Sequence, residues 1–305
     1  MADTAVITAL DARIAVDGAV AIDRLTLSTR GDRVVLAGDP AALIAAITGA
    51  SLSPSASSDD DPPGEAYVIA GSLLVAGHDV TSGAHTAVIG AALLDPPLPP
   101  SWSAEEYVAW GARLGGAPRR AARELAAQAI ARVGLSASRK HAASALSLPE
   151  RRALCLAQAA VLSPEVLIAE GPLSGLSGDA AALVMAALEA VTEGRRAVIT
   201  ASRLDPALPE GALCRGADHL ILLAGGEVAL EGHPGELYAG ARVYSLMVSR
   251  NAALLQAELA SRGIDLRGGP IRFSAALPEG TSTRDILLSA QAANAAVVEL
   301  VPVIG

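Results

Sequence analysis

The sequence is poor in several residue types that common functional sites need. Its 305 residues include one lysine (Lys140), one phenylalanine and two cysteines, and aromatic residues make up 2% of the chain. With so few large side chains, Ala, Val and Leu must fill the core, which is typical of helices packed over a parallel sheet. The formal net charge is −9 and the sequence has no block of basic residues, so we expect no nucleic-acid partner.

Long apolar runs and metal-ligand patterns are also missing. No uncharged apolar stretch reaches the ~18 residues that a membrane-spanning helix needs, and Met1 to Thr4 has no basic region ahead of an apolar one. We therefore expect a soluble, cytoplasmic protein without a signal peptide. Cys155 and Cys214 lie far apart without a CxxC partner, and the histidines show no ligand spacing, so we expect no metal site.

Short apolar strands alternate with helical segments along most of the chain, which predicts an α/β fold. The strand patterns cover residues 34–38, 66–74, 166–169, 197–201 and 219–223. The helical patterns cover residues 41–47, 103–114, 119–133, 148–162 and 180–191. Between the first helix and the second strand, the Ser-, Asp- and Pro-rich stretch 51–64 is predicted to be a mobile loop.

A separate pattern begins near residue 240. Strands are predicted over 243–247, 271–276 and 297–303, and helices over 251–262 and 282–293. This is a βαβαβ unit of its own. We therefore predict two domains, residues 1–240 and a small α/β domain of residues 241–305.

The segment from Leu146 to Ser177 carries a family resemblance. It reads LSLPERRALCLAQAAVLSPEVLIAEGPLSGLS, and its order of helix, Pro-Glu turn, apolar strand and Pro-x-x-Gly-Leu resembles ATP-binding-cassette (ABC) ATPases from the signature motif to the D-loop. Residues 241–305 resemble the small domain appended to many ABC-2-type exporter ATPases. The resemblance implies a P-loop-derived mixed sheet with a helical subdomain at about residues 95–160, followed by that small domain.

The phosphate-binding loop is where the sequence departs most from the family. Such a loop needs glycine amides around the phosphates, a lysine, and a Ser or Thr for Mg²⁺. Here Gly38 is followed by Asp39 and Pro40 and then by a helix, so the loop is roughly four residues short of the motif. Pro40 removes an N–H donor and Asp39 adds a negative charge. Because Lys140 is the only lysine, no shifted loop exists elsewhere in the sequence.

The other positions implied by the resemblance also lack the family's chemical groups. Glu170 aligns with the Walker B aspartate and keeps a carboxylate, as a residual metal ligand or as a group satisfied by its own loop. Gly171 replaces the catalytic glutamate and cannot act as a base. Leu94 replaces the Q-loop glutamine. The vestigial nucleotide-site positions are Gly38, Asp39, Pro40, Leu94, Ser147, Glu170, Gly171, Ser177 and Ser202.

These losses predict a catalytically inactive pseudo-ATPase: not an enzyme, with no catalytic residues, cofactor or metal. We expect it to dock on an ABC-type permease at the inner face of the cell membrane and to pair with an active or identical ATPase subunit. Trp102, Tyr107 and Trp110 are candidate permease contacts, although Tyr107 and Trp110 at i and i+3 would also suit a core. The alternatives are a subunit that binds Mg-ATP weakly and hydrolyses it at a composite site with a partner, and a free-standing regulatory scaffold.

Overall fold

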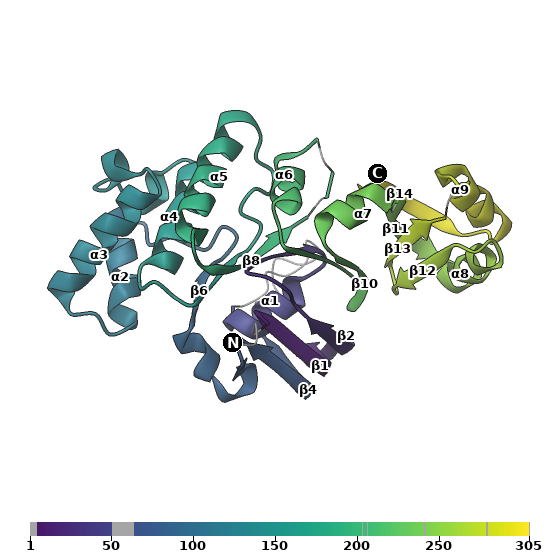
Figure 1. The fold of residues 1–305 in the computed structure, drawn as a ribbon, viewed down its shortest axis with the longest axis horizontal. Helices are drawn as coiled ribbons and strands as arrows, with labels where there is room; N and C mark the ends of the chain where they lie inside the picture. Colours follow the sequence, from purple (N-terminus) through teal and green to yellow (C-terminus); the bar gives the residue numbers. More distant parts are fainter. Residues whose placement is uncertain are drawn as a thin grey trace.

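The computed structural model describes residues 5–50, 64–202, 204–205, 207–240, 242–278 and 280–304. Most of the predicted loop 51–64 and the N-terminal Met1 to Thr4 lie outside the described residues, so the expectations about them stay predictions. The described residues form three sheets (Figure 1). No helix among them combines the length and the apolar character needed to cross a bilayer.

The central sheet has six strands in the order β10-β9-β3-β8-β7-β6, with parallel pairing everywhere except between β9 and β10. Its strands are β3 (Arg33–Gly38), β6 (Ile89–Ala92), β7 (Val166–Ala169), β8 (Arg196–Ala201), β9 (His219–Ala224) and β10 (Glu227–Gly232). The middle strands are mostly apolar because both of their faces are covered. This confirms the predicted α/β fold with a mixed sheet.

One face of the central sheet is covered by α1 and a four-stranded antiparallel sheet in the order β2-β1-β4-β5. These elements are β1 (Ile7–Val16), β2 (Ala19–Ser28), α1 (Ala41–Thr48), β4 (Ala66–Val75) and β5 (His78–Asp79). Two short 3-10 turns, η1 (Val80–Ser82) and η2 (Ala84–Ala87), lead to β6. The sequence predicted α1, β3 and β4, but not β1 and β2.

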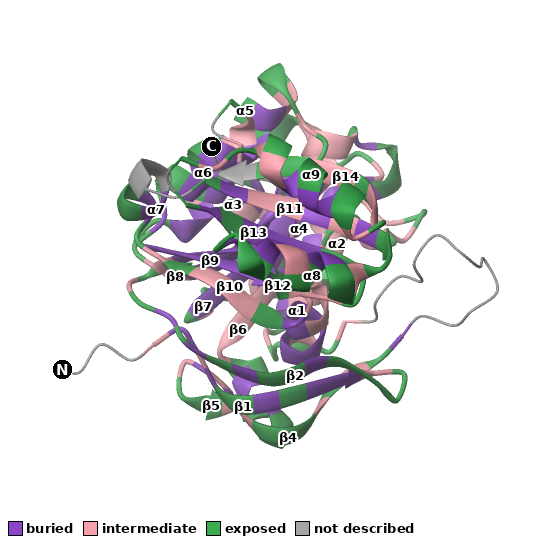
Figure 2. Ribbon diagram, turned by 90° about the vertical axis from the view of Figure 1, so that its right-hand side faces the viewer, coloured by how far each residue is buried: buried purple, intermediate pink, exposed green. Residues whose placement is uncertain are grey.

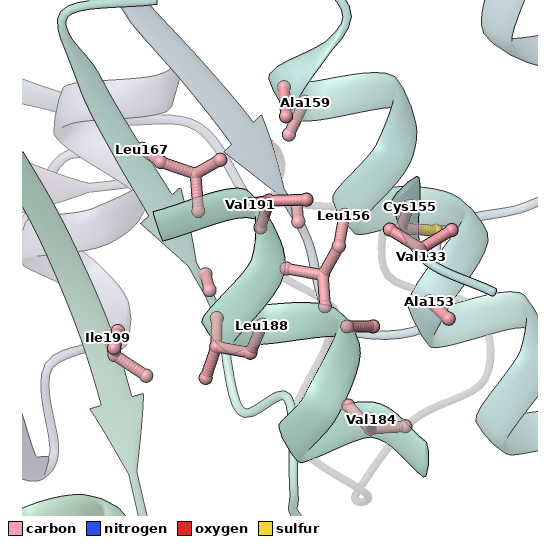
Figure 3. Close-up of a cluster of buried hydrophobic side chains, with 14 of the residues drawn as sticks. Val133, Ala153, Cys155, Leu156, Ala159, Leu167, Val184, Leu188, Val191 and Ile199 are labelled. Atoms are coloured by element: carbon pink, nitrogen blue, oxygen red, sulfur yellow. The ribbon is translucent and has the colours of Figure 1, made fainter. Parts of the chain in front are cut away.

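The other face is covered by helices. The helices on this side are α2 (Ala104–Leu114), α3 (Arg119–Arg132), α4 (Leu148–Ala160) and α5 (Gly178–Thr192), with turns η3 (Ser136–Ser138) and η4 (Ala143–Ala145). Helix α4 contacts β6 and β7, and α2 and α3 pack against α4. Helix α2 begins with a capping box of Ser103 and Glu106. Leu156 of α4, Leu167 of β7 and Leu188 of α5 belong to one shared core (Figure 3). Helices α2, α3 and α4 form the predicted helical subdomain at one end of the molecule (Figure 1).

The C-terminal part has its own sheet, in the order β12-β13-β11-β14, and its own apolar core. It follows α6 (Pro209–Arg215) and α7 (Pro234–Gly240) and consists of β11 (Arg242–Arg250), α8 (Ala252–Ser261), β12 (Asp265–Gly268), β13 (Arg272–Leu277), α9 (Thr283–Ala292) and β14 (Ala296–Ile304). The sequence predicted a βαβαβ unit, and the structure adds β12, which gives the βαββαβ order of ferredoxin-like folds. The domain boundary near residue 240 stays a prediction.

The C-terminal sheet meets the main body through glycine turns. Gly225, in the turn between β9 and β10, lies so close to the main chain of Gly269 that an added Cβ would be 2.4 Å from its nitrogen. Arg267 of β12 also donates a hydrogen bond to the carbonyl oxygen of Ala229 in β10. In the side view, buried residues run through the central sheet and its helices, and exposed residues gather on the outer faces (Figure 2).

Candidate functional site

The fold brings several of the predicted positions to one edge of the central sheet. Gly38 ends β3, Ser202 follows β8, Glu170 follows β7 and Leu94 follows β6, and these four strands are parallel neighbours. In open α/β sheets, ligand sites form at the carboxyl ends of the strands. The sequence interpretation therefore selected four positions that lie at the carboxyl edge of the parallel strands, and their role in binding stays a prediction.

The start of α1 offers backbone donors and little else. Gly38 has a φ of 85°, and the N–H of Asp39 is already used in a 3.0 Å bond to the carbonyl oxygen of Leu223. Pro40 is the N-cap residue, and no side chain caps the helix. The amides of the first turn of α1 therefore have no acceptor within the helix. Lys140 pairs with Glu105 at the start of α2 and does not supply a charge here.

Glu170, directly after β7, is held by the segment that follows β6. One carboxylate oxygen accepts a 3.1 Å bond from the N–H of Leu94, whose side chain is 41% exposed. Gly171 donates a 2.7 Å bond to the hydroxyl of Thr200. Among the described residues no group of three or more His, Cys, Asp or Glu side chains is placed to hold a metal ion. Mg²⁺ in nucleotide sites is usually held by one or two carboxylates together with waters and substrate phosphates, so the carboxylate of Glu170 fits a metal ligand only where ATP supplies other oxygens.

The predicted serine positions are used in local structure. The N–H and hydroxyl of Ser147 both bind the carboxylate of Glu150, forming a capping box at the start of α4. This contact lowers the pKa of Glu150. Ser202 donates to the carboxylate of the buried Glu210 at 3.0 and 3.2 Å. Ser177 is the N-cap residue of α5, without a side-chain cap bond.

Sequence reasoning missed Arg152, a buried residue of α4. Its guanidinium pairs with Asp95 at 3.1 Å and donates to the carbonyl oxygens of Gly171, Pro172 and Ser174. It thereby connects the positions that follow β6 and β7. Only its place in the segment that resembles the ABC signature region could have drawn attention to it.

The three candidate permease contacts lie in two environments. Trp102 and Trp110 form an edge-to-face pair with ring centroids 5.6 Å apart, and Trp110 is 42% exposed. Tyr107 packs against the core and hydrogen bonds to Cys155, and burial raises the pKa of both groups, that of Cys155 to about 12. The geometry therefore favours a core position for Tyr107 and a surface position for Trp110, with the half-buried Trp102 beside it, and the role of the tryptophan pair stays a prediction.

The chain is similar in sequence and in fold to known proteins. A Fe(3+) ions import ATP-binding protein, FbpC 1 of Rhizobium meliloti, is 31% identical over 171 residues, which cover 55% of this chain and 47% of that protein. The energy-coupling factor transporter ATP-binding protein EcfA of Methanothermobacter thermautotrophicus is 27% identical over 154 residues, 49% of this chain and 48% of that protein. The structure of cbiO1 from Clostridium perfringens, described as part of the ABC transporter complex cbiONQ, has a TM-score of 0.60 at 19% identity, covering 78% of this chain and 92% of that one.

The chain has the ABC ATPase fold and is similar to ABC transporter ATP-binding subunits. It spans about half the length of the curated relatives it matches. No family model matches it.

The comparisons contradict the prediction of a catalytically inactive, non-enzymatic subunit. The two curated relatives are named as ATP-binding proteins of transport systems, and neither name describes an inactive protein. The prediction judged the site from one chain's residues, above all the short loop at Gly38 and the replaced Gly171. An ABC site, as the family resemblance implies, is built from two ATPase domains. The losses in one chain therefore do not decide whether the assembled site works.

Proposed function

We propose that this protein is the ATP-binding subunit of an ABC transporter, and that it binds ATP weakly and hydrolyses it slowly at a composite site with a second ATPase domain. The observation that carries the proposal is the ABC ATPase fold together with relatives named as ATP-binding proteins. The uncapped first turn of α1, at the ligand-binding edge of the sheet, is the part of this chain that would meet the phosphates.

The chain's own contribution to ATP affinity is small. A helix N-terminus stabilises a nearby anion by about 0.3–1 kcal/mol, and this chain adds neither a lysine nor a hydroxyl in the first turn of α1, while Asp39 is exposed beside it. A dissociation constant on the order of 1 mM corresponds to about −4 kcal/mol, which is the range we expect for the chain alone. Tighter binding of Mg-ATP would then depend on groups of the second domain.

The proposed partners are an ABC-type permease and a second ATPase subunit, identical or different. We place the protein at the inner face of the cell membrane, attached through the permease. The Trp102–Trp110 pair is the proposed permease contact, because it is a partly exposed aromatic pair on the helical subdomain. The ferredoxin-like C-terminal domain would correspond to the domain appended to ABC-2-type exporter ATPases.

The test compares the chain alone with the assembly purified from native membranes in mild detergent. We expect calorimetry to give weak Mg-ATP binding for the chain alone, and tighter binding with measurable phosphate release for the assembly. Glu170→Gln should lower the rate of phosphate release, whereas Glu165→Gln, at the opposite end of β7, should leave it unchanged. If the assembly neither binds ATP at 10 mM, about ten times the expected constant, nor releases phosphate, the proposal fails.

A further inference from the structure

Arg152 joins three segments of the chain that are distant in sequence. It lies on α4, its side chain is 8% exposed, and it pairs with Asp95 after β6. On its other side it donates to the carbonyl oxygens of Gly171 and Pro172 at 3.4 and 3.3 Å and to that of Ser174. We call residues 171–177, between β7 and α5, the β7–α5 loop.

The two ends of this contact differ in exposure. The carbonyl oxygens bind the buried guanidinium, whereas the side chain of Asp95 is 46% exposed. Asp95 and Arg152 both line a surface recess of about 240 Å³, together with Pro96, Pro97 and Leu98. A group that entered this recess would therefore meet the exposed end of the ion pair first.

The backbone of Asp95 gives a second reason to expect that the Asp95 end of the contact can change its position. The φ of Asp95 is 45°, in the left-handed region, which Asp enters more readily than most non-glycine residues but at a cost that neighbouring contacts offset. Among the described contacts of Asp95, the bonds from Nε and Nη2 of Arg152, at 3.3 and 3.1 Å, are the ones available to do so.

We propose that Arg152 is a positioning residue that couples the recess at Asp95 to the β7–α5 loop. This role rests on the proposed function, in which the helical subdomain meets a permease and the ATP site is shared with a second ATPase domain. When Asp95 moves, the buried guanidinium loses its counter-charge and has to rearrange its bonds to the loop. A displacement in the recess thereby changes the position of the loop.

An arginine suits this role because its planar group presents five N–H donors in a fixed fork. One edge of the fork binds the carboxylate through two nitrogens, and Nη1 reaches the carbonyl oxygens. A lysine at this position would offer a single nitrogen without the fork, so it could not hold both sides in one geometry. Moving the carboxylate away leaves the buried guanidinium without its counter-charge, which is costly and ties the two sides together energetically.

Hydrogen exchange of the isolated full-length chain tests the coupling. The probes are the amides of Ser174 and Leu176, which make single-turn bonds to Gly171 and Leu173 inside the loop. Arg152→Gln should speed their exchange roughly tenfold. Asp95→Asn should speed it roughly threefold, although residue 95 makes no described bond to the loop.

Two controls separate coupling from general loss of stability. Arg151→Gln changes the neighbouring arginine of α4, which makes no described bond to the loop, and should leave the exchange of both probes at the wild-type rate. Amides in the middle of α3 should exchange at the wild-type rate in all three variants. The proposal is overturned if Asp95→Asn leaves the loop unchanged, or if α3 accelerates as much as the loop. Failure of ATP binding would refute the proposed function and leave this result standing.

Discussion

Replacing Gly38 by alanine should destabilise the protein because of how β3 ends. Gly38 has a φ of 85°, and a Cβ there would lie 2.1 Å from the carbonyl oxygen of Leu223 and 3.0 Å from Cδ1 of Leu222. The carbonyl oxygen belongs to the neighbouring strand β9 and also accepts the N–H of Asp39. It cannot move aside without disturbing that bond and the end of the β3–β9 pairing.

The magnitude follows from two separate costs. Alanine at a positive φ loses about 1 kcal/mol relative to glycine. Forcing an extra carbon into a filled space costs typically about 1–3 kcal/mol, and a contact with a backbone atom belongs at the upper part of that range. Together they predict a loss of about 3 kcal/mol. In a protein of this size, about 2–4 °C of melting temperature is lost per kcal/mol, so the expected shift is about 6–12 °C.

Gly49→Ala is the matched control for Gly38→Ala. Gly49 ends α1 with a φ of 67°, but a Cβ there would have no heavy atom within 4 Å. It should therefore show only the backbone cost of about 1 kcal/mol. Urea unfolding followed by circular dichroism, together with calorimetric melting, would measure both variants against wild type.

The comparison of the two variants can refute the reasoning. If Gly38→Ala is no less stable than Gly49→Ala, the close approach of β3 to Leu223 is not present in solution. The structural account of the start of α1 would then be wrong, including the use of the Asp39 N–H by Leu223.

Three further predictions concern the helical subdomain. Leu156→Ala removes a 1% exposed side chain and should lower the free energy of unfolding in urea by about 3 kcal/mol. Leu162→Ala, at a 43% exposed position, should lower it by less than about 1 kcal/mol. Equal losses in the two variants would contradict the core position of Leu156. Burial raises the pKa of Cys155 to about 12 from 9.0. The contribution of the neutral thiol to stability is therefore present below pH 9 and declines as the pH rises from 9 towards 12. If the unfolding free energy of the wild type falls no more than that of Cys155→Ala between pH 8 and 10, this account of Cys155 is wrong. Trp110→Ala should reduce co-purification of the protein with membrane proteins, and Leu114→Ala on the same helix is the control. If both variants co-purify equally well, Trp110 is not part of the permease interface.

Much of the fold could be predicted because local signals agreed with long-range packing. Continuous apolar runs predicted the buried parallel strands, and the helical patterns predicted from residues 103 and 282 begin where the structure has capping boxes at Ser103 and Ser282. Strands β1 and β2 were missed because bulges break their alternation: Asp11 and Arg24 have positive φ values, and the pairing register shifts near both. Strand β12 has four residues and ends at Gly268, too short for a periodic signal.

The candidate site could be predicted only in part. The resemblance and the parallel topology correctly brought Gly38, Leu94 and Glu170 to one edge. The contacts of Arg152, by contrast, join residues 19 to 57 positions apart, and no local pattern encodes such pairings. The mistaken prediction of inactivity has a related origin, since a sequence of one chain says nothing of groups supplied by a second.

The contact between Gly225 and Gly269 has a consequence for engineering this protein. At this point the main chain of one turn contacts the main chain of the other. A replacement domain must therefore also have a glycine turn here, because side chains at this contact would push its sheet away from β10. A replacement C-terminal domain chosen only for its ferredoxin-like topology would fold, yet it would dock at a different angle. Chimeras at this junction should therefore be designed around the two glycine turns, with residues 224–226 and 268–269 transferred as a pair.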